Sequence, residues 1–135
     1  MITVSAVVNA SIEKVWDSWT NPAHIVNWNN ASDDWHTPKA SNDLYKDGRF
    51  TFTMAAKDGS FSFDFGGIYT AVDPQKKISY IMDDGRVADV LFESDGNSVS
   101  ITETFQAENI HSTEMQEAGW QAILNNFKKY TESLV

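Results

Sequence analysis

The sequence of 135 residues contains no cysteine and only three prolines. Without cysteine the protein can form no disulfide, no thiolate nucleophile and no cysteine-ligated zinc site. Positive charge is scarce as well, because ten Lys and Arg stand against nineteen Asp and Glu, a net charge of −9. Such a chain repels phosphate backbones and anionic lipid headgroups. We therefore expect no nucleic-acid partner and no membrane partner.

Long apolar runs are absent too. No segment approaches the roughly 18 consecutive apolar residues that a membrane-spanning helix needs. The first cation is Lys14, so the N-terminal residues lack the basic region of a secretory signal. We expect a soluble, cytoplasmic protein. Its content of 41% hydrophobic and 13% aromatic residues suffices for one core, and we expect a single domain over residues 1–135.

The signatures of metal and cofactor sites are also missing. His24, His36 and His111 do not fall at the short spacings that place two metal ligands together. No glycine-rich phosphate loop opens a helix, and no serine elbow is present. We therefore expect no metal and no cofactor.

What the sequence has in abundance is turn signals. Asp-Gly pairs, and in one case Asp-Pro, occur at residues 47–48, 58–59, 73–74, 84–85 and 95–96. Asp-Gly between alternating apolar runs is the strongest short-range hairpin signal, and strands joined in this way are antiparallel. The pattern predicts a meander with strands at about 43–46, 49–56, 61–72, 77–82, 86–93 and 98–106. Gly66-Gly67 predicts a bulge or sharp bend in the longest strand.

Three helices and one further strand complete the prediction. Residues 2–8 alternate as a strand does, Ser11 can cap a short helix, and Asn21-Pro22 can start another that ends near Trp28. The polar residues 29–43 are predicted to be a long loop. A 3.6-residue apolar period over about 113–133 predicts one long C-terminal helix. The expected fold is α+β: a seven-stranded curved antiparallel sheet around this helix, with two short helices between strands 1 and 2.

This order of elements resembles the helix-grip fold of the START-like (SRPBCC, birch-pollen-allergen-like) superfamily. Within it, the chain is most similar to the homologues of the activator of the heat-shock protein ninety ATPase. The matching residues are Ala10–Pro22 with Trp28, Asp47–Phe50, Gly67–Tyr69 with Val72–Pro74, and Gly119-Trp120 with Leu124. The resemblance implies a cavity between the sheet and the long helix, which in relatives binds hydrophobic ligands or hosts chemistry.

Aromatic and apolar side chains on the expected inner faces are the candidates for lining such a cavity. Three tryptophans, Trp16, Trp19 and Trp120, lie on helix faces that must be buried in any case. Trp28 and Trp35 flank the polar loop and are candidates for the mouth of the cavity. The complete set of candidate ligand-binding residues is Trp28, Trp35, His36, Phe52, Phe63, Tyr80, Phe92, Glu103, Trp120 and Leu124.

Glu103 is the one charged residue whose position is unusual. Strict alternation places it on the apolar face with Ile101 and Phe105. A carboxylate there is costly unless it is paired, hydrated or near an opening. Two interpretations stay open. In the first, Glu103 forms a salt bridge, with Arg86 as the best partner, or a local bulge turns it outward. In the second, Glu103 is a polar group that orients a ligand inside the cavity.

The function expected from these observations is non-catalytic binding of a small hydrophobic molecule. One alternative is an enzyme of the cyclase, aromatase or hydratase kind with Glu103 or His36 as acid or base. Another is a chaperone regulator with a chaperone partner, which the family resemblance alone suggests. A cavity filled by its own Phe side chains would leave no ligand site. Whether the protein forms a homodimer stays open.

Overall fold

The computed structural model describes residues 1–135 and confirms the α+β class. The elements in chain order are β1 (Ile2–Val8), α1 (Ile12–Thr20), α2 (Pro22–Trp28), β2 (Trp35–Asn42), β3 (Arg49–Ala56), β4 (Ser62–Asp73), β5 (Lys77–Met82), β6 (Val87–Asp95), β7 (Ser98–Phe105) and α3 (Thr113–Ser133). All seven strands form one antiparallel sheet in the order β1-β7-β6-β5-β4-β3-β2. No helix is long and apolar enough to cross a membrane.

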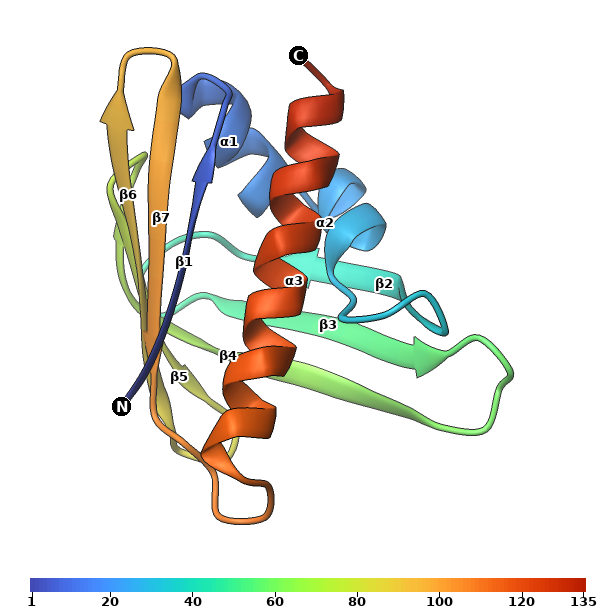
Figure 1. Ribbon diagram of the computed structural model, residues 1–135. Coiled ribbons are helices and arrows are strands. Elements are labelled where there is room, and N and C mark those ends of the chain that lie inside the picture. The colour runs from blue at the N-terminus through green and yellow to red at the C-terminus, as the bar shows by residue number, and fades with distance from the viewer.

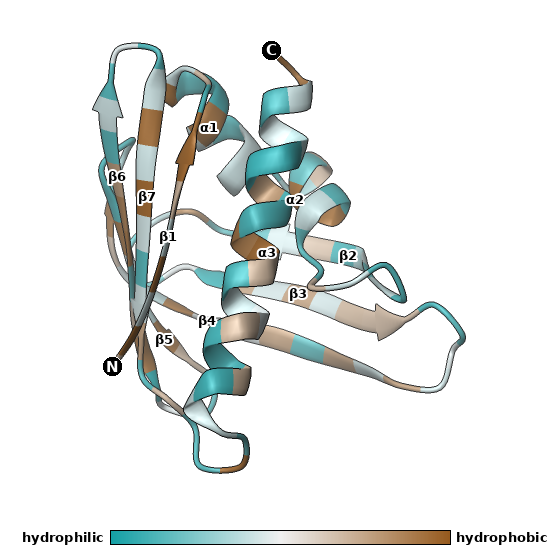
Figure 2. Ribbon diagram, viewed as in Figure 1, coloured by the Kyte–Doolittle hydropathy of each residue, from teal (hydrophilic) through white to brown (hydrophobic).

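The sheet curls so that its two ends run in different directions. β1, β6 and β7 run up the view of Figure 1, whereas β2, β3 and β4 run across it, and α3 lies in front of the concave side. The two short helices α1 and α2 close the upper end of this concavity. Figure 2 places hydrophobic bands on β1, β7 and the middle of α3, the elements that pack together.

The turns follow the predicted chemistry with one variation. Gly59, Gly85 and Gly96 take positive φ angles of 79°, 91° and 67°, as hairpin turns require. At the first turn it is Asp47, with φ of 70°, that takes the left-handed conformation. Gly48 is needed there for space, because an added Cβ would lie 2.0 Å from the carbonyl oxygen of Asp43.

The predicted loop over residues 29–43 is wrong, because residues 35–42 form strand β2 at the edge of the sheet. The predicted strand at 43–46 is absent, and those residues belong to the turn into β3. β2 carries Pro38, and its register against β3 shifts between His36 and Lys39. Proline and a register break are typical of edge strands. A polar edge strand with one interruption shows neither clean alternation nor an apolar run, so its sequence reads as a loop.

The bulge expected at Gly66-Gly67 lies elsewhere, since the register of β4 against β5 shifts between Tyr69 and Ala71. Gly67 serves a different purpose, because the aromatic ring of Phe50 packs against its backbone. A Cβ at Gly67 would lie 2.4 Å from the carbonyl oxygen of Ile81 and 3.0 Å from the Phe50 ring. The glycine therefore lets the largest core side chain of β3 lie flat on β4.

The two short helices begin at the predicted capping residues, and α3 begins at a serine of the same kind. The side chain of Ser11 accepts a hydrogen bond from the backbone N–H of Lys14, and that of Ser112 accepts one from Met115. Asn21 is the C-terminal cap of α1 and the N-terminal cap of α2, where its side chain accepts from Ala23 N–H. These caps fix the angle between the two short helices, and α3 runs unbroken over 21 residues.

Replacing Gly67 with alanine should lower the free energy of unfolding by about 1–3 kcal/mol, because the added methyl group overpacks the contact with Phe50 and Ile81. Gly119→Ala is the matched control. Its Cβ meets nothing within 4 Å, and alanine in a helix should stabilise by up to about 1 kcal/mol. Urea denaturation of both variants gives the two values. An unchanged midpoint for Gly67→Ala would contradict the packing described here.

Candidate functional site

A cavity of about 330 Å³ lies between the concave face of the sheet and α3. Thirteen of the seventeen residues that line it are hydrophobic. The sheet contributes residues from β3, β4, β5 and β7, and α3 contributes Gly119, Trp120 and Ile123. An apolar hollow with a few polar groups is the usual form of a small-molecule site.

Tryptophan side chains from α1 and α2 form one wall. The rings of Trp19 and Trp28 lie 5.1 Å apart, and each packs edge-on against Phe127 of α3 at 4.8 Å. The indole N–H of Trp28 donates a 2.8 Å hydrogen bond to the carbonyl oxygen of Ser18. This bond holds the ring in place and leaves it an apolar surface toward the cavity.

Phe50 is the centre of the sheet wall. Its ring contacts those of Phe52, Phe65, Tyr69 and Tyr80, with centroids between 5.0 and 5.7 Å away. The hydroxyl of Tyr69 is occupied, because it donates to the side-chain oxygen of Asn42 at 2.5 Å. The wall is therefore aromatic and apolar over most of its area.

Trp120 faces this wall from α3. Its indole stacks on the ring of Phe105 from β7, with centroids 3.8 Å apart and planes inclined by 11°. This stack joins the helix to the strand that carries Glu103. Trp120 is half-buried, so one part of its ring belongs to the core and another part lines the cavity.

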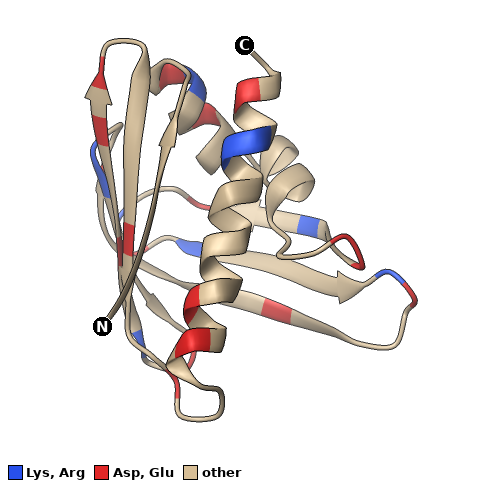
Figure 3. Ribbon diagram, in the orientation of Figure 1, with Lys and Arg blue, Asp and Glu red and all other residues tan.

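Glu103 points into the cavity, as the strand alternation predicts. Its side chain is 6% exposed, and no cation lies within ion-pair distance of it. Burial raises the pKa of the Glu103 carboxyl from 4.5 to about 8, because a desolvated carboxylate is disfavoured. Glu103 is the only charged residue on β7 (Figure 3), and at pH 7 it is mostly protonated.

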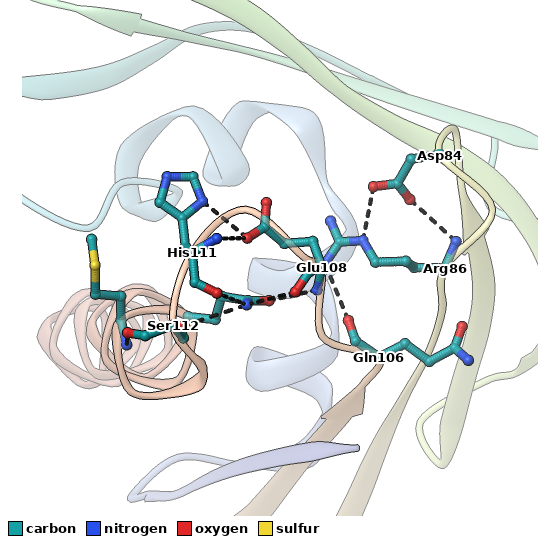
Figure 4. Close-up of polar contacts among 8 residues, drawn as sticks. Asp84, Arg86, Gln106, Glu108, His111 and Ser112 are labelled. Carbon is teal, nitrogen blue, oxygen red and sulfur yellow. Dashed lines mark hydrogen bonds and ion pairs between the residues drawn. The ribbon is translucent and has the colours of Figure 1, made fainter.

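The predicted ion pair between Glu103 and Arg86 is absent. The guanidinium of Arg86 instead pairs with Asp84 at 2.8 Å and donates to the backbone oxygen of Gln106 at 3.1 Å. Figure 4 shows Arg86 held between these two partners. Asp84 is two residues away in the same turn, so the local pair forms without drawing Arg86 deep into the apolar interior.

The same close-up shows how the segment after β7 is attached to α3. Glu108 accepts hydrogen bonds from the backbone and ring nitrogens of His111, at 2.6 and 3.0 Å (Figure 4). The side chain of Gln116 bonds to the backbone of both residues. These bonds hold the segment that follows Gln106, the backbone partner of Arg86, against the first turn of α3.

Six of the ten candidate residues predicted from the sequence line the cavity, and four do not. The six are Trp28, Phe52, Phe63, Tyr80, Glu103 and Trp120. Phe92 packs against Trp16 and Trp19, and Leu124 is fully buried in the core. His36 is exposed on β2, and Trp35 packs against Phe61 and Phe63 outside the lining. Which of these residues contact a ligand stays a prediction.

Sequence reasoning missed several lining residues, among them Asn29, Ala31 and Gly119. Asn29 and Ala31 follow α2 in a segment without periodicity, so no pattern assigns them a face. Gly119 has no side chain to mark it, yet it leaves open space on α3. A glycine inside a long helix costs stability, and this was the one available signal.

Glu103→Gln should raise the free energy of unfolding by about 3 kcal/mol at pH 7, because the carboxyl, ionised in the unfolded chain, must take up a proton on folding and the amide need not. For wild type, the folded state binds more protons than the unfolded state between pH 4.5 and about 8. Its stability should therefore fall as pH rises through this window, and the variant should lack that fall. Denaturation from pH 4 to 8.5 measures both. Glu93→Gln, on the exposed face of β6, is the control and should follow wild type.

Comparisons with known proteins agree with this architecture. The family model described as "Activator of Hsp90 ATPase homolog 1-like protein" matches residues 9–132. The AHSA1-like protein from Aeromonas hydrophila is 46% identical, with a TM-score of 0.90 over 98% of this chain and 94% of that one. A structure from Cytophaga hutchinsonii is 52% identical, with a TM-score of 0.84 over 98% and 92%.

A structure from Nitrosomonas europaea shares the fold at 14% identity, with a TM-score of 0.83 over 98% of this chain and 94% of that one. The comparison with curated proteins finds no match. The family match covers nearly the whole chain and agrees with the description of the Aeromonas hydrophila structure. The chain therefore belongs to the family of Activator of Hsp90 ATPase homolog 1-like proteins, a branch of the START-like (SRPBCC) superfamily.

Proposed function

We propose that this protein is a non-catalytic binding protein that holds a small hydrophobic molecule between the curled sheet and α3. One observation carries the proposal: about 330 Å³ of space remains inside a wall that is otherwise packed with aromatic rings. Protein interiors are normally packed to crystal density, so an apolar space of this size is costly to keep. A ligand that fills it would recover the lost contacts.

The cavity carries the proposal, and the Hsp90 ATPase activation that the family description mentions does not. The polar groups of the lining are few, and most apolar contacts come from rings fixed by their neighbours. Trp28 is held by its bond to Ser18, and Tyr69 by its bond to Asn42. Such preorganised walls favour binding because little side-chain freedom is lost.

An enzymatic role in the same cavity is the second candidate, and one observation favours it. The pKa of Glu103, raised to about 8, lies in the range where a carboxyl group can act as general acid or base. The two roles separate in one measurement. For an enzyme, Glu103→Gln should abolish turnover of a bound substrate while its affinity is kept, whereas a binding protein should return each ligand unchanged.

N-phenyl-1-naphthylamine, an uncharged dye that brightens in apolar surroundings, should bind wild type saturably with one site per chain and quench tryptophan fluorescence. Gly119→Leu should weaken this binding at least about tenfold, because the new side chain enters the cavity from α3. Ala118→Leu, one position away on the exposed face of the helix, should bind the dye as wild type does.

Two results would overturn the proposal. One is the absence of saturable dye binding to wild type. The other is equal binding by Gly119→Leu and wild type, which would place the dye on the outer surface. Circular dichroism of both leucine variants confirms that α3 is intact.

A further inference from the structure

The inner end of the cavity carries three hydrogen-bond donors that have no acceptor within the protein. Glu103, protonated at neutral pH, makes no hydrogen bond within the protein, and neither does the hydroxyl of Tyr80. Arg86 uses two of its three nitrogens, Nε toward Asp84 and Nη1 toward Gln106, which leaves Nη2 without a partner. All three side chains line the cavity, so a ligand there could supply the acceptor that the protein does not.

Sheet register brings these donors to one place. Tyr80 is on β5 and Glu103 is on β7, the two strands on either side of β6. Ala88 of β6 lies opposite Tyr80, and Val90 lies opposite Glu103. Arg86, which comes immediately before β6, precedes Ala88 by two residues and therefore lies on the same side of the sheet.

Both ionisable donors keep their protons at neutral pH. The pKa of Glu103 is about 8 because of burial. Burial, followed by the nearby charge of Glu103, raises the pKa of Tyr80 well above its ordinary value. The groups around Glu103 are Tyr80 on β5, Tyr69 on β4, and Arg86 with its partner Asp84. β1 places Val4 beside it, and α3 contributes Gly119, Trp120 and Ile123 to the cavity, none of which titrates.

We infer that the cavity selects an uncharged apolar molecule that ends in a hydrogen-bond-accepting oxygen, such as a ketone or ester carbonyl, placed against Glu103, Tyr80 and Arg86. The inference rests on the proposed function and names the class of ligand. A carbonyl oxygen has two lone pairs and can accept from two of the three donors at once. The apolar body then extends along Phe50, Phe65 and Trp120 toward Phe63 at the exposed end of the lining.

Charged ligands fit this end less well. A carboxylate would need a cation, but the charge of Arg86 is already balanced by Asp84 at 2.8 Å. An ammonium group would face Arg86 and could bind only by ionising Glu103, whose charged form the surroundings disfavour. An alkane would offer no acceptor to any of the three donors.

Four naphthalenes with the same body test this class: 2-acetylnaphthalene, 2-ethylnaphthalene, 2-naphthoate and 2-(aminomethyl)naphthalene. Titration calorimetry at pH 7 should show the ketone binding most tightly. From wild type to Glu103→Leu, the ratio of ketone to ethyl affinity should fall about five- to tenfold, the effect of one lost hydrogen bond. Glu103→Gln keeps an N–H donor and should retain most of the preference.

The pH dependence separates a hydrogen bond from shape alone. Ketone affinity for wild type should be constant from pH 6 to 7.5 and fall above pH 8, where Glu103 loses its donor proton. Glu103→Gln should show no such fall. Tyr80→Phe should lower the ketone-to-ethyl ratio without changing the pH profile.

The failures can be told apart. If the ethyl compound binds and the ketone binds no better, the ligand class is wrong while the proposed function stands. If naphthoate or the amine binds most tightly, the inference is overturned in favour of a charged ligand. If none of the four binds, the proposed function fails and the inference fails with it.

Discussion

One helix has to cover the concave face of seven strands, and the rest of the structure depends on this constraint. α3 packs closely against β1, and its Trp120 stacks on Phe105 of β7. Toward β3 and β4 the sheet turns away from it (Figure 1). The tryptophans of α1 and α2 fill one end of the remaining space, and the cavity is what they do not fill. A curled sheet and one straight helix cannot match along their whole length.

Local chemistry explains which parts of the fold could be predicted from the sequence. Turns and caps depend on one to four neighbouring residues, so Asp-Gly pairs and Ser11 give β-hairpins and a helix start at the predicted places. β2 could not be predicted because its pairing with β3 comes from tertiary context. The role of Gly67 is also not local, since its partner Phe50 lies on the neighbouring strand.

In the candidate site too, the features set by neighbouring residues could be predicted, and those set by tertiary packing could not. Alternation along β7 is local and correctly places Glu103 on the inner face. Its surroundings are not local, and the predicted partner Arg86 is bound by Asp84, which lies closer along the chain. Phe92 shares the inner face as expected, but α1 covers it with Trp16 and Trp19. Periodicity gives the face of a strand, and only the packing of helices decides which part of that face remains open.

Strand β2 has a consequence for assembly. Pro38 has no N–H to offer a neighbouring strand, and the Thr37 hydroxyl donates to the backbone oxygen of Asn29 at 2.5 Å. The side chain of Asn42 donates to the backbone of Thr20, which attaches the other end of β2 to α1. Pro38 therefore interrupts the row of N–H groups along this edge, which makes the addition of a further strand at β2 less favourable.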